Sequence, residues 1–217
     1  MSILVYCITD EGTSSDVGAG VAALPVLHCR HAGLDALFSR NTSAESWTGA
    51  SLKQSAREFH NVLHRVFAAR AIVPFRFPTL MQDEDELAAH LRDNAAEYSG
   101  QLKRFEKLVQ MDISIASSEP ISSNASQISG AEYLRGREKQ ADELQAMAKQ
   151  VEQLASETAR SWRDRRGSNS LRLFALVHRD SVDGFRERLK KLSVPQNLEV
   201  RVSGPWPVTE FLELKQR

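Results

Sequence analysis

Hydrophobic and polar residues alternate along three short stretches at the start of the chain, a pattern typical of half-buried β-strands. These predicted strands are Ile3–Thr9, Pro25–Arg30 and Leu34–Ser39. The short connection His31-Ala32-Gly33 separates the last two and indicates a hairpin turn. The chain is therefore expected to begin as a sheet.

The pattern then becomes helical. Ser51, followed by Gln54 three residues later, forms a capping box that predicts the start of a helix. Its apolar residues recur every three or four positions: Leu52, Ala56, Phe59, Leu63, Val66 and Phe67. The run Ala71–Phe77 predicts a further strand, and Pro74 indicates a sheet edge or a bulge, because proline has no N–H to donate.

Two longer helices are predicted further along, each with apolar residues at alternating steps of three and four. The first begins at the acidic residues 83–86, where negative charge favours a helix N-terminus, and carries Ala88, Leu91, Ala95, Tyr98, Leu102, Phe105 and Val109. The second runs from Gly130 to Arg166 and carries Ala141, Leu144, Ala148, Val151, Ala155, Thr158 and Trp162. A strand at 111–116 and a serine-rich loop at 117–129 separate them. These heptad patterns predict a coiled-coil hairpin.

The end of the chain predicts a strand, a helix and a strand. The strands are Leu171–His178 and Leu198–Val202, and the helix starts near Ser181. This order requires parallel pairing if both strands share a sheet. The sequence Ser-Gly-Pro-Trp-Pro follows at 203–207, where two prolines bracket a tryptophan and stop the strand.

Composition narrows the class of protein. Lys+Arg and Asp+Glu are both 28 among 217 residues, and a net charge of zero argues against a dedicated nucleic-acid binder. A neutral chain also lacks long-range self-repulsion, so self-association is open to it. No stretch approaches the roughly 20 apolar residues of a membrane span, and the start lacks a basic leader. Two cysteines without an export signal indicate a reduced, cytoplasmic setting.

Candidate chemistry is sparse. His28, Cys29 and His31 lie close in sequence, and His60 and His64 lie one helical turn apart, an arrangement that can contribute to a zinc site. However, neighbouring residues of a strand point to opposite faces, so a metal site is not the favoured interpretation.

Other patterns also have simpler interpretations. Gly18–Ala23 matches G-x-G-x-x-A, but an extended segment follows it where a dinucleotide site needs a helix. The arginines at 160–172 suit the negative end of a helix better than a nucleic acid. The sequence contains no nucleophile elbow, Walker loop or kinase motif. We therefore assign no catalytic, cofactor or metal residue and do not expect an enzyme.

Three segments together resemble a known family. They are Arg70–Thr79, Ser129–Arg135 and Ser203–Pro207, the last followed by Glu210-Phe211, and in this order they resemble the GvpL/GvpF family of gas vesicle proteins. The chain departs from the family's usual pattern at Pro78 and Cys7, where glycine is usual, and after the Trp-Pro pair. The family positions carried over are Pro74, Arg76, Thr79, Gly130, Tyr133, Leu134, Gly204, Pro205, Trp206 and Pro207. We expect Tyr133 and Trp206 to lie in the core, since large aromatic residues are usually well buried.

The resemblance implies an α+β protein without enzymatic activity. It implies an N-terminal ferredoxin-like domain at 1–110 and a C-terminal α+β domain at 111–217, with long coiled-coil-like helices. It also implies an accessory or minor structural role in gas vesicle formation, with chaperone-like binding of the hydrophobic shell protein and of other gas vesicle proteins. Two alternatives remain: a small-ligand or metal-binding regulator on a ferredoxin-like scaffold, and an enzyme whose carboxylates are assembled by the fold.

Overall fold

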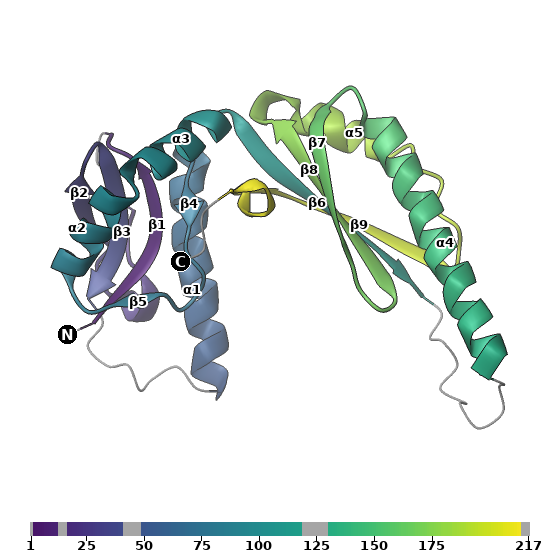
Figure 1. Ribbon diagram of the computed structural model, residues 1–217, viewed down its shortest axis with the longest axis horizontal. Coiled ribbons are helices and arrows are strands. Elements are labelled where there is room, and N and C mark those ends of the chain that lie inside the picture. Colours follow the sequence, from purple (N-terminus) through teal and green to yellow (C-terminus); the bar gives the residue numbers. More distant parts are fainter. Residues whose placement is uncertain (1, 13–16, 41–48, 119–129, 214–217) are drawn as a thin grey trace. The chain divides into compact units, whose positions relative to one another are not determined.

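The protein folds into two compact units in a computed structural model that describes residues 2–12, 17–40, 49–118 and 130–213 (Figure 1). The first unit comprises the described residues up to Lys107 together with Leu212 and Glu213. The second unit is Leu108–Phe211. The division falls three residues before the one expected at 110/111, and the end of the chain returns to the first unit.

The first unit is built on an antiparallel sheet with the strand order β2-β3-β1-β4. Its strands are β1 (Ile3–Asp10), β2 (Leu27–His31), β3 (Leu34–Arg40), β4 (Val73–Pro74) and β5 (Leu80–Met81), which also pairs with β1. Ala32 and Gly33 connect β2 and β3 with φ angles of 54° and 77°, as a two-residue hairpin turn requires. The first three predicted strands and the turn are therefore confirmed.

The fourth predicted strand is much shorter than expected. Only Val73 and Pro74 pair with β1, and the N–H of Phe75 still donates to the carbonyl of Tyr6 at 2.9 Å. The chain then leaves β1 and returns to it as β5, where Thr79 accepts a hydrogen bond from Val5. Pro74 lies in the terminal strand of the sheet, as its missing N–H predicts.

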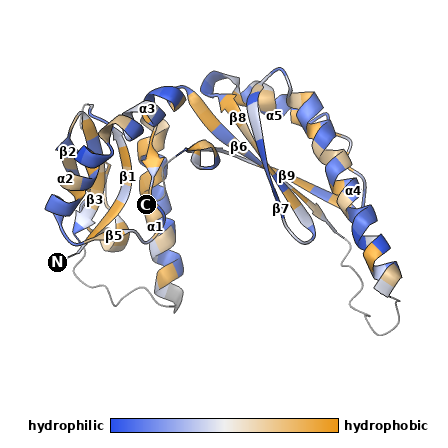
Figure 2. Cartoon of the chain, viewed as in Figure 1, coloured by the Kyte–Doolittle hydropathy of each residue, from blue (hydrophilic) through white to orange (hydrophobic). Residues whose placement is uncertain are grey.

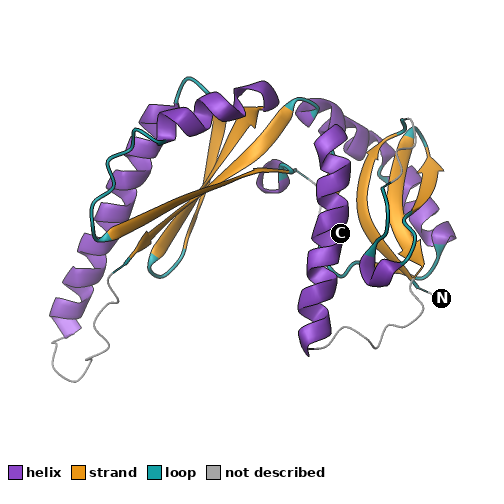
Figure 3. Cartoon of the chain, turned by 180° about the vertical axis from the view of Figure 1, so that it is seen from behind, coloured by secondary structure: helices purple, strands orange, loops and turns teal. Residues whose placement is uncertain are grey.

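Helices cover both faces of this sheet (Figures 1 and 3). One face packs against α1 (Gly49–Ala69), where the ring of Phe59 lies 5.1 Å from that of Tyr6. The other packs against α2 (Glu84–Asp93) and α3 (Ala95–Phe105), whose buried residues share a core with those of β1 and β3. Helix α1 starts at Gly49, so the capping box predicted from Ser51 is wrong. The acidic start of α2 is confirmed, because Asp83 accepts a hydrogen bond from the Glu86 N–H.

The second unit has the element order β-α-β-β-α-β. Its elements are β6 (Leu108–Ser117), α4 (Gly130–Ala155), β7 (Ala159–Arg166), β8 (Ser170–His178), α5 (Val182–Leu189) and β9 (Leu198–Trp206). The sheet is antiparallel throughout, with the order β7-β8-β6-β9. This is the ferredoxin-like, split βαβ topology. Strands β8 and β9 share the sheet, but β6 lies between them, so the expected parallel pairing does not form.

The ferredoxin-like order was expected in the first unit. There, the described elements follow the order β-β-β-α-β-β-α-α, which does not fit that topology. The ferredoxin-like order that the resemblance implies for the first unit is found in the second unit instead. Both units combine helices with a sheet, so the α+β class is confirmed.

The predicted coiled-coil hairpin is wrong. The first heptad helix is broken at Asn94 into α2 and α3, and most of its apolar residues pack in the core of the first unit. Val109, the last of them, lies in β6 of the second unit. The second ends at Ala155, whose carbonyl accepts hydrogen bonds from the Thr158 N–H and hydroxyl, both at 3.0 Å. Trp162 therefore lies in strand β7, with its ring 6.2 Å from that of Phe185 in α5. Each of these helices packs its apolar residues against the sheet of its own unit, and not against the other helix.

Helices α4 and α5 lie on one face of the second sheet (Figure 1). The buried residues of α5 are Val182, Phe185 and Leu189, as predicted. Those of α4 are Leu144, Met147, Ala148, Val151 and Ala155, all in its second half. Residues 130–143 of α4 contain no buried side chain, and the start of this helix extends past the sheet (Figure 1). No helix in the described ranges is long and apolar enough to cross a membrane.

A buried chain of hydrogen bonds fixes the segment before β2 against the first sheet. The Val21 N–H donates to Tyr6 Oη at 3.0 Å, and Ser39 Oγ donates to the Pro25 carbonyl at 2.8 Å. Tyr6 Oη therefore donates to Ser39 Oγ, 2.9 Å away, so that both hydroxyl groups donate one hydrogen bond and accept one. A Cβ on Gly20 would lie 2.3 Å from Tyr6 Oη and 2.8 Å from Ser39 Oγ. Only glycine leaves room for this network.

Gly20→Ala is expected to lower the free energy of unfolding by about 2 kcal/mol, because the added methyl group displaces a buried, satisfied hydroxyl pair. Gly100→Ala is the matched control, since its Cβ meets no atom within 4 Å and alanine is the better helix former. Urea denaturation measures both. A Gly20→Ala protein as stable as the wild type would contradict the proposed packing.

Candidate functional site

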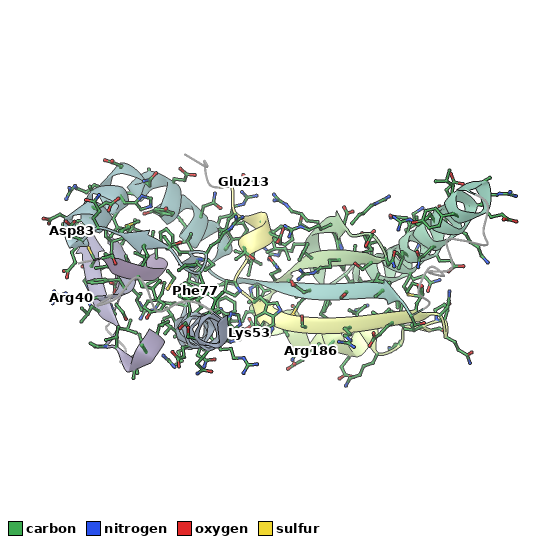
Figure 4. The ribbon with its side chains drawn as sticks, turned by 90° about the horizontal axis from the view of Figure 1, so that it is seen from below. Arg40, Lys53, Phe77, Asp83, Arg186 and Glu213 are labelled. Atoms are coloured by element: carbon green, nitrogen blue, oxygen red, sulfur yellow. The ribbon has the colours of Figure 1, made fainter. Side chains whose placement is uncertain are left out.

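The first family segment forms the connection between β4 and β5. Thr79 Oγ1 donates to the carbonyl of Arg76 at 2.6 Å, which closes the turn, while the Thr79 carbonyl accepts the N–H of Val5 at 3.0 Å. Phe77 lies beside α1, 5.3 Å from a phenylalanine ring of that helix (Figure 4). Together with the pairing of Pro74 on β1, these contacts give the segment a structural role in the first unit.

The second family segment is the start of α4. Gly130 is its first residue, and Tyr133 and Leu134 follow with 46% and 62% of their surface exposed. The expectation that Tyr133 belongs to the core is therefore wrong. The reason is that α4 buries side chains only from Leu144 onward. Further along the same half, Arg137 Nη1 reaches Asn169 Oδ1 at 3.3 Å, which links the helix to the β7–β8 turn.

The third family segment closes β9. Gly204 has a φ of +115°, and a Cβ there would lie 2.8 Å from the Gln110 carbonyl oxygen, so both backbone and space require glycine. Its own carbonyl accepts a hydrogen bond from Arg186 Nη2 at 2.5 Å. Trp206 is half-buried, with its indole N–H 3.3 Å from Ser203 Oγ. The expectation of a core position for Trp206 is met only partly.

A residue outside the family segments joins this turn to the rest of the sheet. Gln110 on β6 is buried, its side-chain oxygen accepts the Glu210 N–H at 3.0 Å, and its amide donates to Asp112 at 2.8 Å. The carboxylate of Glu210 in turn accepts hydrogen bonds from Arg165 Nη2 at 3.0 and 2.8 Å. Sequence patterns gave no sign of Gln110, because a polar residue that alternates with apolar ones along a strand is ordinarily expected to face solvent.

The structure separates the family positions into two groups. Pro74, Arg76 and Thr79 lie in the first unit, whereas Gly130, Tyr133, Leu134, Gly204, Pro205, Trp206 and Pro207 lie in the second. Within the second unit, the start of α4 and the end of β9 belong to different elements and make different contacts. The exposed start of α4 is the candidate contact surface, and the other positions shape turns.

The histidines are placed for packing and ion pairing. His28 Nδ1 lies 2.9 Å from Asp35 Oδ2, a buried carboxylate, and the rings of His60 and His64 meet edge to face at 4.8 Å. Burial, and secondly the neighbouring His64, lower the pKa of His60. Within the described ranges, no group of three or more His, Cys, Asp or Glu residues is arranged to hold a metal ion.

The two cysteines are buried thiols. Cys7 and Cys29 both lie in the first sheet, and burial raises the pKa of each. A thiol with a raised pKa stays protonated at neutral pH and is a poor nucleophile. Burial likewise raises the pKa of Tyr98 to about 12, and its hydroxyl lies 2.7 Å from His90 Nε2. These titratable groups stabilise the core as neutral species.

Comparison with known proteins agrees with this architecture. A family model described as gas vesicle synthesis protein GvpL/GvpF matches residues 2–213. The crystal structure of GvpF from Anabaena sp. PCC7120 is similar with a TM-score of 0.82 and 11% identity, covering 99% of this chain and 97% of that one. GvpF from Microcystis aeruginosa gives a TM-score of 0.79 and 13% identity, over 98% and 99% of the two chains.

The evidence for relationship rests on the family match. No curated protein matches the sequence. At 11% and 13% identity, the two crystal structures show a shared fold. The family match, in contrast, spans nearly the whole chain and includes all three segments whose resemblance the sequence suggested. This chain therefore belongs to the GvpL/GvpF family of gas vesicle synthesis proteins.

Proposed function

We propose that this protein is a non-enzymatic accessory or minor structural protein of gas vesicle formation, which binds the hydrophobic shell protein and assists its nucleation or assembly. Membership of the GvpL/GvpF family supports a gas vesicle-related role and association with other gas vesicle proteins. The proposal places the protein at the gas vesicle. A chaperone-like task is physically reasonable, because a hydrophobic subunit exposes surface that aggregates unless a partner covers it.

The observation that carries the proposed contact is the exposed start of α4. Tyr133 and Leu134 are large apolar residues that remain largely exposed, on a helical half in which no side chain is buried. Hydrophobic residues occur there among hydrophilic ones (Figure 2). A helix can use such residues as anchors in the groove of a partner, and tyrosine is enriched at the energetic centres of interfaces.

The double variant Tyr133→Ser/Leu134→Ser is expected to recover at least about tenfold less shell protein in a pull-down, because two buried anchors of an interface are lost. Leu52→Ser/Leu80→Ser is the matched control, since it removes two exposed apolar residues of the first unit. All four positions are exposed, so thermal melting should change little.

Equal recovery by the two double variants would exclude the start of α4 as the contact. Failure of the wild-type protein to recover shell protein, together with normal vesicles in a strain that lacks the gene, would contradict the proposed function itself.

We propose a structural role for Trp206. Its partial burial and its place opposite Gln110 indicate that it closes the end of the second sheet. Trp206→Ala should lower the free energy of unfolding by about 2 kcal/mol, less than the roughly 3–5 kcal/mol typical of a fully buried tryptophan. Urea denaturation measures the change in stability, and the same pull-down measures whether Trp206 also contributes to binding. Unchanged stability with lost binding would make Trp206 a partner anchor and overturn this role.

A further inference from the structure

Strand β9 forms one edge of the second sheet, and part of its backbone faces away from the sheet (Figure 1). Just before β9 begins, the Ser118 N–H donates to the Asn197 carbonyl at 3.0 Å, so Asn197 directs its backbone groups toward β6. These directions alternate from residue to residue along an antiparallel pair. The N–H and C=O groups of Val200 and Val202 therefore point outward, away from β6. We call residues 198–202 the open edge.

The outward-facing backbone groups at the two ends of this stretch already have partners within the chain. The Leu198 N–H donates to the Pro195 carbonyl at 3.0 Å, and the Gly204 carbonyl accepts a hydrogen bond from Arg186. Among the residues that the structure describes, no other hydrogen bond reaches the outward backbone groups of the open edge. Its central groups are therefore available to another strand.

The side chains of the open edge differ between its two faces. Glu199 and Arg201 lie on one face with 54% and 75% of their side chains exposed, and Arg201 Nε donates to Glu199 Oε1 at 2.8 Å. Val200 and Val202 alternate with them on the other face and are only partly covered. An edge with apolar side chains and free backbone groups is a template for pairing with another strand.

The opposite edge of the same sheet is protected from such pairing. Strand β7 carries five charged residues among its eight, four of them arginines, and its register shifts between Ala159 and Ser161. Charged side chains and bulges are the usual means by which proteins prevent pairing at a sheet edge. The open edge of β9, in contrast, has one residue of each charge and a regular register with β6 up to Ser203.

The open edge is complementary to itself. If two β9 strands pair antiparallel about a two-fold axis at Val200, each Glu199 lies opposite Arg201 of the second copy. The residues whose backbone points outward then meet as hydrogen-bonded pairs. Val200 exchanges both of its hydrogen bonds with Val200 of the second copy. On either side of the axis, the Val202 N–H donates to the Leu198 carbonyl.

Charge selects this register over the neighbouring one. A two-fold axis at Arg201 pairs Val200 with Val202 and forms as many hydrogen bonds, but it places the two Arg201 side chains opposite each other. Like charges directly opposite destabilise a sheet, whereas opposite charges stabilise it. In the register centred on Val200, the ion pair within each strand is kept, because every Glu199 carboxylate then lies between two guanidinium groups.

We propose that the open edge of β9 joins two copies of this protein into a symmetric dimer, in which their second sheets form one continuous antiparallel sheet. The same edge is used by both copies, so the assembly closes at two. A strand edge this short buries less than the roughly 1,200 Å² of a standard interface, so we expect a dissociation constant of about 10 μM or weaker. This inference goes beyond the proposed function, because it concerns a second copy of the chain and not the shell protein.

Sedimentation velocity of the full chain, from about 1 to 500 μM, measures dimer formation. Arg201→Glu should weaken dimerisation at least about tenfold, because both cross-strand pairs then oppose two carboxylates. Glu199→Arg should weaken it to the same degree, because both pairs then oppose two guanidinium groups. Arg166→Glu is the matched control, since it makes the same charge change beside an acidic residue on the opposite edge strand. This control should stay within about twofold of the wild type.

Two further samples test the register. In an equimolar mixture of the Arg201→Glu and Glu199→Arg chains, every cross-strand pair unites opposite charges, so a heterodimer should form. Glu199→Arg/Arg201→Glu exchanges the two charges without changing the net charge, and it should dimerise within about threefold of the wild type. Both positions are exposed, so thermal melting of all these variants should change little.

Several results would overturn the proposal. They are a wild-type chain that stays monomeric at the highest concentration, an Arg201→Glu chain that dimerises as well as Arg166→Glu, and a mixture in which no heterodimer forms. Growth beyond a dimer would indicate pairing of β9 with β7 of the next copy, and would also contradict a symmetric dimer.

The shell-protein pull-down separates this inference from the proposed function. Arg201→Glu should recover as much shell protein as the wild type, because the start of α4 is unchanged. Lost recovery in this variant, together with a monomeric wild type, would assign the open edge to the shell protein and overturn the dimer. A wild type that dimerises as predicted but recovers no shell protein contradicts the proposed function alone.

Discussion

The packing of α4 and α5 on one face of the second sheet determines which side chains of the second unit stay exposed. Helices α4 and α5 bury the apolar side chains of that face, and the burial of α4 is confined to the half that begins at Leu144. No side chain of residues 130–143 is buried, and only Arg137, Gln140 and Glu143 among them are partly covered. On the opposite face, Arg165 and Arg172 stack on the buried ring of Phe174, and Leu176 on the same face of β8 is buried as well. The exposed start of α4, the proposed contact surface, follows from this arrangement.

Sequence patterns predicted most strands correctly, but the extent and the packing of the two long helices were predicted wrongly, for a physical reason. Apolar residues at steps of three and four mark one face of any helix, whether it packs on another helix or on a sheet. The pattern therefore did not distinguish a coiled coil from α2 and α3 on the first sheet. It also continued by chance into β7, where Trp162 packs on α5 from a strand that is otherwise polar. An edge strand of this kind has little hydrophobic alternation to detect.

The features of the candidate site could be predicted from the sequence to different degrees. The need for glycine at position 204 follows local rules, because a proline follows it and the turn takes a positive φ there. The exposure of Tyr133 was not predictable from its type, since it depends on where α4 begins to bury side chains, at Leu144. The alignment of Arg165, Arg172 and Arg201 across the second sheet depends on the register of four strands, and the first and last of these arginines are 36 positions apart in the sequence. No local motif encodes such a row.

We propose that the exposed start of α4 contacts the gas vesicle shell protein. Hydrogen–deuterium exchange of the full chain, with and without shell protein, measures this contact directly along the backbone. The account predicts slower exchange in residues 130–143 when shell protein is present, because binding excludes water and suppresses fraying of this half of the helix. Helix α1 of the first unit should exchange at the same rate in both samples. Unchanged exchange at 130–143 in a sample that binds shell protein would contradict the claim.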